Sequence, residues 1–427
     1  MTTANWPKLK LGDCVNLLAG FAFKSQHFTD NPNDVPLVKG ENVSQGCILW
    51  DISKRWPASD WERMEKYHLL PRDVVVAMDR PWIPAGLKWA FIRESDPKAL
   101  LVQRCARLRS SNGRLDQDFL RFVIGGLGFE NYVKPITSGV NVPHISGQQI
   151  LDFEFTLPPL STQRRIASIL SAYDELIENS QRRIRVLEKM ARALYREWFV
   201  ELRFPGHEKI SRVAAVLGEI PNGWKVTDLA KVCTDGNGIQ TGPFGSQLHE
   251  ADYSEEGVPV VMPKDLIGFR IRTDTIARIP EETAEKLSRH RMQPNDIVYG
   301  RRGDIGRRAF LMPYQVGWFC GTGCLRIRPN PQAVNGWYLF NYLGQDDVVG
   351  LIAGRAQGVT MPNLNTGVMS SVPVKFPTRK LQDDFTRLTF PMAEAREALT
   401  AKIGNLRRTR DLLLPRLLSG HVVPPSY

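Results

Sequence analysis

The sequence lacks the segments and spacings that mark several large classes of protein. No apolar run approaches the ~20 residues of a membrane-spanning helix, and the N-terminus shows no basic segment followed by an apolar one. The six cysteines include no CxxC pair, and the seven histidines are scattered without an HExxH pattern. We therefore expect a cytoplasmic protein with reduced, buried thiols, no secretory signal and no bound metal.

Motifs of nucleotide-dependent and methyl-transfer chemistry are missing as well. The chain contains no GxxxxGKS-type phosphate loop, and no GxGxxG motif follows a predicted strand. It lacks the Asn-Pro-Pro-aromatic and Asp-Pro-Pro-aromatic motifs of amino-methyltransferases, and no acidic pair with a lysine has nuclease spacing. We expect no catalytic residue and no cofactor on this chain. Lys and Arg total 56 against 45 Asp and Glu, and the resulting net charge of +11 favours a polyanion or an acidic partner.

The sequence does contain two long heptad patterns. After Leu157-Pro158-Pro159 there is no Pro or Gly for more than forty residues, and apolar or small residues recur every three or four positions from Ile166 to Trp198. This spacing is typical of the a and d positions of a coiled coil, and about forty residues would form a rod of roughly 60 Å. Because such an apolar seam is unstable alone in water, it needs a partner helix.

The partner helix is predicted 219 residues further along the chain. Adding 219 to each of the ten seam positions gives seven apolar residues, and kinks are expected at Pro391 and Pro415. Two unrelated core helices are the alternative, which ranks lower because the rest of the chain repeats at nearly the same offset. The apolar residues of these two partner-binding helices are Ile166, Leu170, Ile177, Ile184, Leu187, Leu194, Leu399, Ile403, Leu406 and Leu413.

The chain as a whole repeats one plan. Pro158 and Gln163 match Pro377 and Gln382 at an offset of 219, and short loop insertions explain a drift to 218–223 elsewhere. We predict an α+β fold in which two similar α/β globules are separated by two long antiparallel coiled-coil helices with pseudo-two-fold symmetry. The predicted parts are a first globule (1–157), a central helix (158–203), a linker (204–219), a second globule (220–376), a C-terminal helix (377–420) and a tail (421–427).

Each globule is predicted to combine short strands with helices. A segment at 9–18 is compatible with a strand or a short helix, and helices are expected to begin at Asp118 and at Trp337. The predicted strands are 35–38, 73–77, 90–92 and 101–108 in the first globule, and 258–262, 296–299, 309–312 and 324–327 in the second.

The loops between these strands carry the candidate DNA contacts. Residues 300–308 place four Arg and three Gly between two strands; Gly lets a ligand approach the backbone, and Arg grips phosphate or reads guanine. The matching loop, 78–89, is longer and less basic, as expected of two globules that read different sequences. A solvated hairpin tip is the alternative for the Arg-rich loop. For the paired loops at 23–26 and 244–247, a simple turn is an equally good interpretation. The candidate DNA-binding residues are Lys24, Ser25, Gln26, Lys39, Asn42, Arg80, Lys88, Ser246, Gln247, Lys264, Arg301, Arg302, Arg307 and Arg308.

Four segments resemble motifs of the specificity subunits of type I restriction-modification systems. Residues 157–166 look like the junction that opens the central conserved region of that family, and residues 413–420 look like its C-terminal signature. Residues 220–224 are similar to the entry to its second target-recognition domain, and residues 194–200 to the end of its central helix. Residues 376–381 depart from the usual proline-rich junction, so the second helix is expected to enter differently.

The resemblance implies a non-catalytic subunit whose globules are target-recognition domains, each reading one half of a bipartite, asymmetric double-stranded DNA sequence. The helix pair would set the gap between the half-sites. Two modification subunits would dock on the helices and methylate adenine N6 with S-adenosylmethionine, and restriction subunits would join to translocate and cut. The methyl donor would bind those partners. A self-sufficient DNA methyltransferase with a divergent site and a coiled-coil adaptor whose globules bind protein stay open as alternatives.

Overall fold

The computed structural model describes residues 6–84, 86–137, 143–244, 247–356 and 363–425. The chain divides into two compact units: unit 1 comprises residues 1–182 and 399–427, and unit 2 comprises residues 183–398. Each unit therefore contains one globule and part of each long helix. Over the described ranges, no helix combines the length and the apolar character needed to cross a membrane. No group of three or more His, Cys, Asp or Glu side chains in those ranges is arranged to hold a metal ion.

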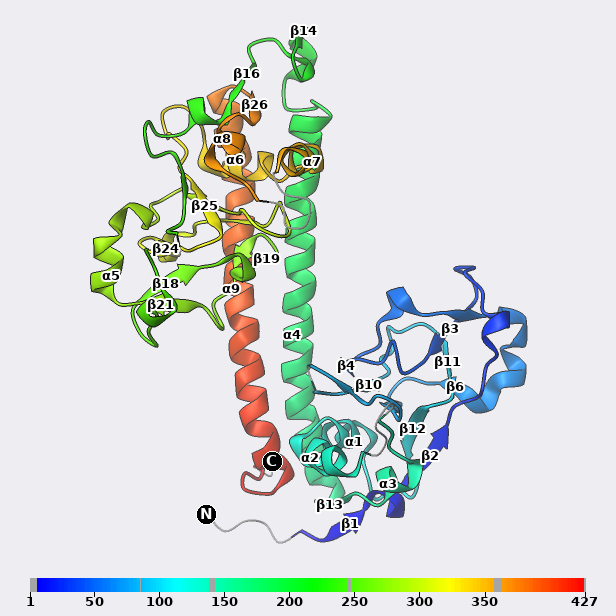
Figure 1. Cartoon of the computed structure of the whole chain (residues 1–427). Coiled ribbons are helices and arrows are strands. Elements are labelled where there is room, and N and C mark those ends of the chain that lie inside the picture. The colour runs from blue at the N-terminus through cyan, green and yellow to red at the C-terminus, as the bar shows by residue number, and fades with distance from the viewer. Residues whose placement is uncertain (1–5, 85, 138–142, 245–246, 357–362, 426–427) are drawn as a thin grey trace. The chain divides into compact units, whose positions relative to one another are not determined.

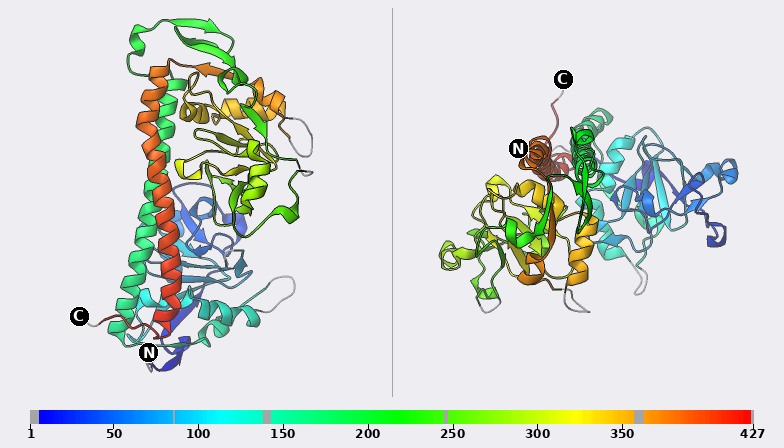
Figure 2. Two further views of the ribbon diagram at one scale, coloured as in Figure 1. Left: turned by 90° about the vertical axis from the view of Figure 1, so that its left-hand side faces the viewer. Right: turned by 90° about the horizontal axis from the view of Figure 1, so that it is seen from above.

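Two long helices, α4 (Leu160–Tyr195) and α9 (Arg379–Leu418), run side by side (Figures 1 and 2). One π-helical turn, Arg196–Val200, extends α4, and α9 continues through Pro391 and Pro415 without ending. The ten predicted seam positions of α4 and their ten counterparts on α9 are all buried or half-buried. The heptad prediction is therefore confirmed.

Polar pairs inside each unit define the register of the helices. In unit 1, Arg410 Nη1 donates to Asp174 Oδ1 at 2.7 Å, and in unit 2, Arg396 Nη1 lies 4.0 Å from Glu188 Oε1. Within unit 1, Arg165 Nη1 also donates to the Pro425 carbonyl at 2.7 Å, so moving back along the chain from 174 to 165 corresponds to moving forward from 410 to 425, which is an antiparallel arrangement. The antiparallel arrangement predicted from the repeat is confirmed.

Short strands and helices make up the globule of unit 1. The strands are β1 (Lys8–Lys10), β2 (Val15–Ala19), β3 (Val35–Val38), β4 (Gln45–Gly46), β5 (Arg55–Trp56), β6 (His68–Leu69), β7 (Val74–Ala77), β8 (Trp82–Ile83), β9 (Gly86–Leu87), β10 (Trp89–Phe91), β11 (Ala99–Leu101), β12 (Cys105–Ser110) and β13 (Glu154–Thr156). The helices are α1 (Gln117–Ile124), α2 (Leu127–Ile136) and α3 (Gly147–Leu151). One sheet has the order β2-β12-β7-β10-β4 and a second has the order β5-β3-β11-β6, while β1 pairs with β13.

Unit 2 repeats this plan. Its strands are β14 (Arg212–Ala215), β15 (Gly218–Pro221), β16 (Lys225–Asp228), β17 (Ile239–Thr241), β18 (Val258–Val261), β19 (Leu266–Ile267), β20 (Arg270–Ile271), β21 (Ala277–Ile279), β22 (Ile297–Gly300), β23 (Arg308–Phe310), β24 (Phe319–Cys320), β25 (Cys324–Ile327) and β26 (Pro373–Phe376). Its helices are α5 (Glu281–Lys286), α6 (Gly336–Tyr342), α7 (Asp346–Arg355) and α8 (Thr366–Ser370). The sheet orders β17-β25-β22-β23 and β21-β18-β24, with the β16–β26 pair, correspond to those of unit 1.

One predicted strand is wrong. Residues 101–108 form the end of β11 and the start of β12, with a turn at 102–104 in which Arg104 has φ +69°. The sequence contains no Gly or Pro there, so local composition does not reveal the turn. The corresponding turn of unit 2 does contain Gly, with Gly323 at φ +85°.

A buried ion pair occupies the same place in both globules. In unit 1, Arg109 donates to both carboxylate oxygens of Asp73 at 2.5 and 2.8 Å; in unit 2, Arg328 donates to both oxygens of Asp296 at 2.8 Å. The side chains of Asp73 and Asp296 are 3% and 0% exposed. Arg109 lies on β12 and Arg328 directly follows β25, so each pair ties one of these strands to the residue before β7 or β22.

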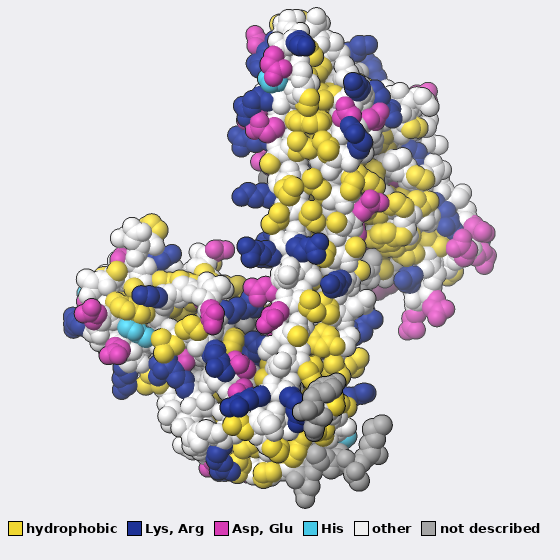
Figure 3. All heavy atoms as spheres, turned by 180° about the vertical axis from the view of Figure 1, so that it is seen from behind, with side chains coloured by type: hydrophobic (Ala, Val, Ile, Leu, Met, Phe, Trp, Pro, Cys, Tyr) yellow, Lys and Arg dark blue, Asp and Glu magenta, His cyan; other side chains and the backbone are white. Residues whose placement is uncertain are grey.

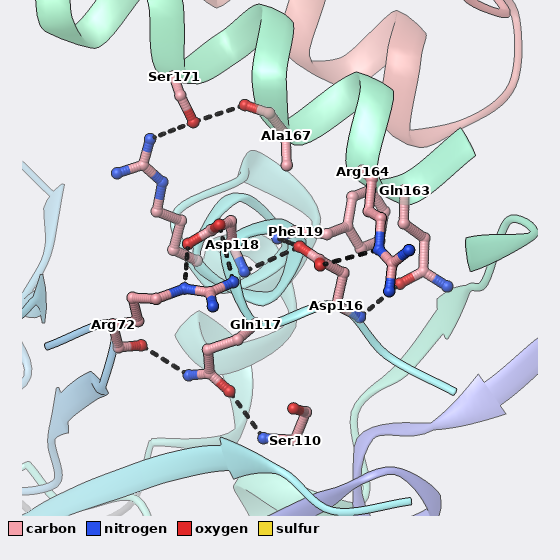
Figure 4. A network of polar contacts seen from close by, with 11 residues as sticks. Arg72, Ser110, Asp116, Gln117, Asp118, Phe119, Gln163, Arg164, Ala167 and Ser171 are labelled. Carbon is pink, nitrogen blue, oxygen red and sulfur yellow. Dashed lines mark hydrogen bonds and ion pairs between the residues drawn. The ribbon is translucent and has the colours of Figure 1, made fainter. Parts of the chain in front are cut away.

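A buried glutamine joins each globule to the long helix that follows it. In unit 1, the backbone N–H of Asp116, the N-cap of α1, donates to Gln163 Oε1 at 2.7 Å (Figure 4). Gln163 Nε2 also donates to the Pro158 carbonyl at 2.8 Å. In unit 2, Gln382 makes both bonds at 2.9 Å, to Asn335 and Pro377. The expectation that the second helix enters differently is wrong, because the residues that vary between the two junctions take no part in these bonds.

The cysteines behave as predicted. All six are free thiols, and five of them are buried. Cys105 and Cys324 open the equivalent strands β12 and β25. Burial raises the pKa of Cys105 to about 12, so this thiol is protonated and unreactive at neutral pH.

Candidate nucleic-acid interface

In each unit, three loops are hydrogen-bonded to one turn, which we call the hub turn. The hub turn is residues 102–104 in unit 1 and residues 321–323 in unit 2. The first loop follows β2 or β17, the second follows β3 or β18, and the third follows β7 or β22. These loops hold most of the candidate contacts from the sequence.

Bonds at corresponding positions hold the three loops in both units, although the first loop is held by a backbone N–H in unit 1 and by the Thr322 hydroxyl in unit 2. The hub turn of unit 1 bonds the three loops through Gln103 N to Phe21 O (2.8 Å), Val102 N to Val38 O (3.0 Å) and Met78 N to Arg104 O (2.8 Å). In unit 2 the contacts are Thr322 Oγ1 to Pro243 O (3.0 Å), Gly321 N to Val261 O (2.9 Å) and Arg301 N to Gly323 O (2.9 Å). The backbone of this region is therefore a common scaffold.

A glycine at the start of each first loop allows its backbone to touch the hub turn. A Cβ on Gly20 would lie 2.2 Å from the Val102 carbonyl oxygen, and one on Gly242 would lie 2.0 Å from the Gly321 carbonyl oxygen. Both contacts are with backbone and cannot relax by rotation of a side chain. Only glycine fits at these two positions.

The side chains on the unit 1 scaffold are mostly polar or basic. Lys24, Ser25 and Gln26 are exposed on and beside a 3-10 turn at Ser25–His27, and Arg80 is exposed with φ +44°. Lys39 is half-buried; its Nζ lies 2.9 Å from Glu41 and 5.4 Å from the centre of the Phe28 ring. All of these residues remain candidates.

Two exposed residues of the unit 1 hub turn were not among the DNA-binding residues predicted from the sequence. Gln103 is exposed, and Arg104 is 61% exposed while its Nη1 lies 2.5 Å from Asp79 Oδ2. Asp79 also meets His144 Nδ1 at 2.5 Å. The sequence signal was hidden because both residues were assigned to the interior of one predicted strand.

In unit 2, four of the candidates remain available to a ligand. Arg302 and Lys264 are exposed, and the 44% exposed Arg307 pairs with Asp304 at 2.9 Å. Gln247 is exposed and accepts a hydrogen bond from Arg289 Nη2 at 3.1 Å. Ser246 lies outside the described residues. Thr322 on the hub turn and Arg289 beside Gln247 were missed, because neither stands in a motif of its own.

Two candidates in unit 1 are corrected, because their side chains are enclosed. Asn42 is 1% exposed; its Nδ2 donates to the Leu37 carbonyl and to Ser53 Oγ, and its Oδ1 accepts from Lys39 N, so it braces the second loop. Lys88 is 7% exposed, and burial lowers the pKa of its ammonium group. Neither side chain is available to a DNA groove.

Two arginines of the Arg-rich loop are corrected for the same reason. Arg301 is 9% exposed, and its Nε donates to Asn363 Oδ1 and to the Leu364 carbonyl. Arg308 is 6% exposed and donates to the carbonyls of Phe340 and Gly306. Arg301 and Arg308, at the two ends of the loop next to the strands, thus hold the loop in place. Arg302 and Arg307, between them, face solvent.

The apolar residues of the two long helices lie mainly inside the units. Ile166 and Leu170 belong to the hydrophobic core of unit 1, together with Leu417. Ile177, Leu399 and Ile403 are buried, and Ile184, Leu187, Leu194, Leu406 and Leu413 are half-buried. These side chains hold the helices together and to the globules.

Several known proteins are similar to this chain. The family model described as the type I restriction modification DNA specificity domain matches residues 3–189. The specificity subunit of type I restriction enzyme EcoBI from Escherichia coli is 22% identical over 96% of this chain and 84% of its own length. The specificity subunit of type I restriction enzyme MjaIX from Methanocaldococcus jannaschii is 24% identical over 71% of this chain and 69% of its own length. That of EcoAI from Escherichia coli is 36% identical, but the match spans 40% of this chain and 28% of the relative.

The fold also has a solved counterpart. The crystal structure of the type I restriction-modification system S subunit from M. genitalium matches 99% of this chain and 97% of its own, with a TM-score of 0.66 and 17% sequence identity. At this identity the match concerns the fold, and it includes two α/β globules and a pair of long packed helices.

Proposed function

Because this chain belongs to the DNA specificity subunits of type I restriction-modification systems, we propose that each globule reads one half of a bipartite, asymmetric DNA target. One observation carries the proposal: the two hub turns hold their loops by corresponding bonds, yet the exposed side chains on those loops differ between the units. Two globules that recognise different DNA sequences are expected to share a backbone scaffold and to differ in the exposed side chains of its loops. The net charge of +11 adds attraction for the DNA backbone.

The exposed residues of each hub suit DNA recognition. In unit 2, Arg302 and Arg307 carry guanidinium groups that bind phosphate or the O6 and N7 atoms of guanine. In unit 1, Arg80, Gln103 and Arg104 offer one amide and two guanidinium groups, so adenine and guanine are both within their chemistry. These exposed loop residues are thus proposed to contact the bases, whereas the buried Arg301 and Arg308 stabilise the fold.

The long helices are proposed to set the gap and to carry the modification subunits. Since the seam residues are buried or half-buried, docking is assigned to the outward side chains, and hydrophobic side chains stand among Lys and Arg over the helices (Figure 3). Those between 44% and 58% exposed are Leu176, Val186, Met190, Val200, Leu388 and Leu412. S-adenosylmethionine and the chemistry of adenine methylation belong to the docked subunits in this proposal, and restriction subunits join to translocate and cut.

Exchange of residues 1–157 for the equivalent globule of a relative tests the proposal. We expect one half-site of the methylated sequence to change and the other half-site and the gap to stay the same, because the hub of unit 2 is untouched. Methylome sequencing of cells that carry each version gives the result. Exchange of 220–376 is the matched control and should change only the other half-site. Methylation that is the same after both exchanges would favour an adaptor over a DNA reader.

Replacement of Arg302 or Arg307 by alanine is expected to weaken binding to the complete target by ~1–3 kcal/mol if the residue reads a base. A residue that contacts only phosphate would instead weaken binding to all sequences alike and lower its salt dependence. Arg387→Ala, which removes a 75% exposed arginine from α9, is the control. Titration of the assembled complex with fluorescent target DNA measures the effect, and wild-type affinity in both loop variants would move the contact elsewhere.

A further inference from the structure

Unit 2 contains a cavity of about 660 Å³ between the second half of α4, the first half of α9 and the corner between α6 and α7. Its aromatic lining includes Tyr195, Phe199, Trp337 and Phe340. Five cationic side chains, Arg192, Arg196, Arg308, Lys375 and Arg396, line it against three acidic ones, Glu188, Asp346 and Asp347. This volume lies within the range of small-molecule sites, roughly 300–1,000 Å³.

The most enclosed charge of this cavity is Arg308. Its guanidinium carbon lies 4.7 Å from the centre of the Phe269 ring and 5.1 Å from that of Phe340, so it contacts two aromatic side chains. Its hydrogen bonds go to two backbone carbonyls, and no carboxylate in the described part of the chain forms an ion pair with it. Burial lowers the pKa of Arg308 to about 10, so it stays charged at neutral pH.

The backbone is strained at the point where Phe269 reaches Arg308. Phe269 is at the tip of the β19–β20 hairpin with φ +62°, a conformation that costs a bulky residue ~1–2 kcal/mol. Gly344 packs against the same guanidinium; a Cβ there would lie 1.2 Å from Arg308 Nη2, so a larger residue would displace the Arg308 side chain from this position. The positive φ of Phe269 and the absence of a side chain at Gly344 both accommodate the guanidinium in this position.

In unit 1, an arginine that contacts two aromatic rings is paired with a carboxylate. Trp89, the first residue of β10, takes the place that Arg308 has on β23, and it packs against Gly125 as Arg308 packs against Gly344. In unit 1 the half-buried Arg121 on α1 lies over two phenyl rings at 4.4 and 4.5 Å. Arg121 Nη2 is 3.4 Å from Asp174 Oδ2 and 2.8 Å from Ser171 Oγ.

The acid that balances the arginine in unit 1 has no counterpart in unit 2. At the repeat offset of 219, Asp174 corresponds to Ala393, and Ala393 lines the cavity. At the same offset Arg121 corresponds to Phe340, so the two arginines stand at different positions of the repeat, but each guanidinium lies within 5.1 Å of two aromatic ring centres. In unit 2, however, a hollow replaces the carboxylate.

We propose that this cavity binds a carboxylate supplied from outside the chain, which takes beside Arg308 the place that Asp174 takes beside Arg121. The aromatic walls select a carboxylate attached to an apolar body. Such a group exists on a small aromatic or aliphatic acid and on an acidic side chain of an assembling subunit, and both present the same chemistry to Arg308.

Titration of the purified full-length chain with benzoate tests the proposal, with tryptophan fluorescence as the signal because Trp337 lines the cavity. We expect saturable binding of benzoate and none of benzyl alcohol, which has the same ring without the charge. Arg308→Met should weaken benzoate binding about tenfold or more, as expected for loss of a charged hydrogen bond. Arg387→Met, on the solvent side of α9, should bind benzoate like the wild type.

A second variant keeps the test valid if Arg308→Met does not fold. Ala393→Asp places the acid of unit 1 in the cavity, so it should abolish benzoate binding and leave the melting temperature equal or higher. A third measurement separates the two sources of the carboxylate. If the acid belongs to a modification subunit, assembly should abolish benzoate binding, and Arg308→Met should weaken assembly. If it is a free ligand, the assembled complex should bind benzoate as the single chain does.

Two results together would overturn the proposal: no benzoate binding by the wild-type chain, and wild-type assembly by Arg308→Met. Benzoate binding that is unchanged in both Arg308→Met and Ala393→Asp would also overturn it, because the site would then lie elsewhere. The titration uses neither DNA nor partner proteins. Its outcome is therefore independent of the proposed reading of DNA, and only the assembly arm rests on that function.

Discussion

Replacement of Asp296 by alanine lowers the free energy of unfolding by about 3–5 kcal/mol, the expected cost of leaving a buried charge without its partner. Asp296 is fully buried, and it accepts hydrogen bonds from Arg328 Nε and Nη2 at 2.8 Å each and from the Gln293 N–H at 2.7 Å. The variant leaves the 15% exposed Arg328 guanidinium enclosed without a carboxylate. Denaturant unfolding followed by circular dichroism measures the loss.

Two further variants decide whether burial is the cause. Asp304→Ala removes a 66% exposed carboxylate, paired with Arg307, from the same unit, and should cost no more than about 1 kcal/mol. The double variant Asp296→Leu with Arg328→Met replaces both charges by apolar groups and should recover part of the lost stability. Equal destabilisation by Asp296→Ala and Asp304→Ala would contradict the assigned role of the buried pair.

Insertion of one heptad into each long helix is expected to lengthen the gap of the DNA target by about 3 bp while both half-sites stay the same. Seven residues extend a helix by roughly 10 Å, which corresponds to about three base pairs. The insertions belong after Ser180 on α4 and after Gly404 on α9. Ser180 lies between Asp174 and Glu188, and Gly404 lies between Arg396 and Arg410, so both interhelical pairs are retained.

Insertion into α4 alone is the informative control. It shifts Asp174 by two turns relative to Glu188 but leaves Arg396 and Arg410 as they are, so the two pairs cannot form in one register. We expect this single insertion to lower the melting temperature and to abolish target methylation. Methylome sequencing of the paired insertion provides the decisive measurement, and a target with an unchanged gap would remove the proposed role of the helices as a spacer.

Periodic features of the fold were predictable from the sequence. The two heptad seams place every one of their positions in buried or half-buried sites, because a 3.6-residue period and an apolar stripe together determine which side of a helix is hidden. The offset of 219 also paired Gln163 with Gln382, and the two residues make matching hydrogen bonds. A repeat carries such information because both copies must bury corresponding residues. The division of residues 101–108 into two strands was not predictable, since the turn at Arg104 is held by partners on other loops.

The residues of the site were only partly predictable, and the Arg-rich loop explains why. Its composition by itself determined that this segment is a basic loop between two strands, which the structure confirms for residues 301–307. Only the tertiary structure decided that Arg301 and Arg308 point inward while Arg302 and Arg307 face solvent. The deciding contacts come from Asn363, Phe340 and Gly344, which are distant in the sequence. An arginine is buried where the fold supplies carbonyl acceptors and aromatic faces for it, and local sequence contains no record of those neighbours.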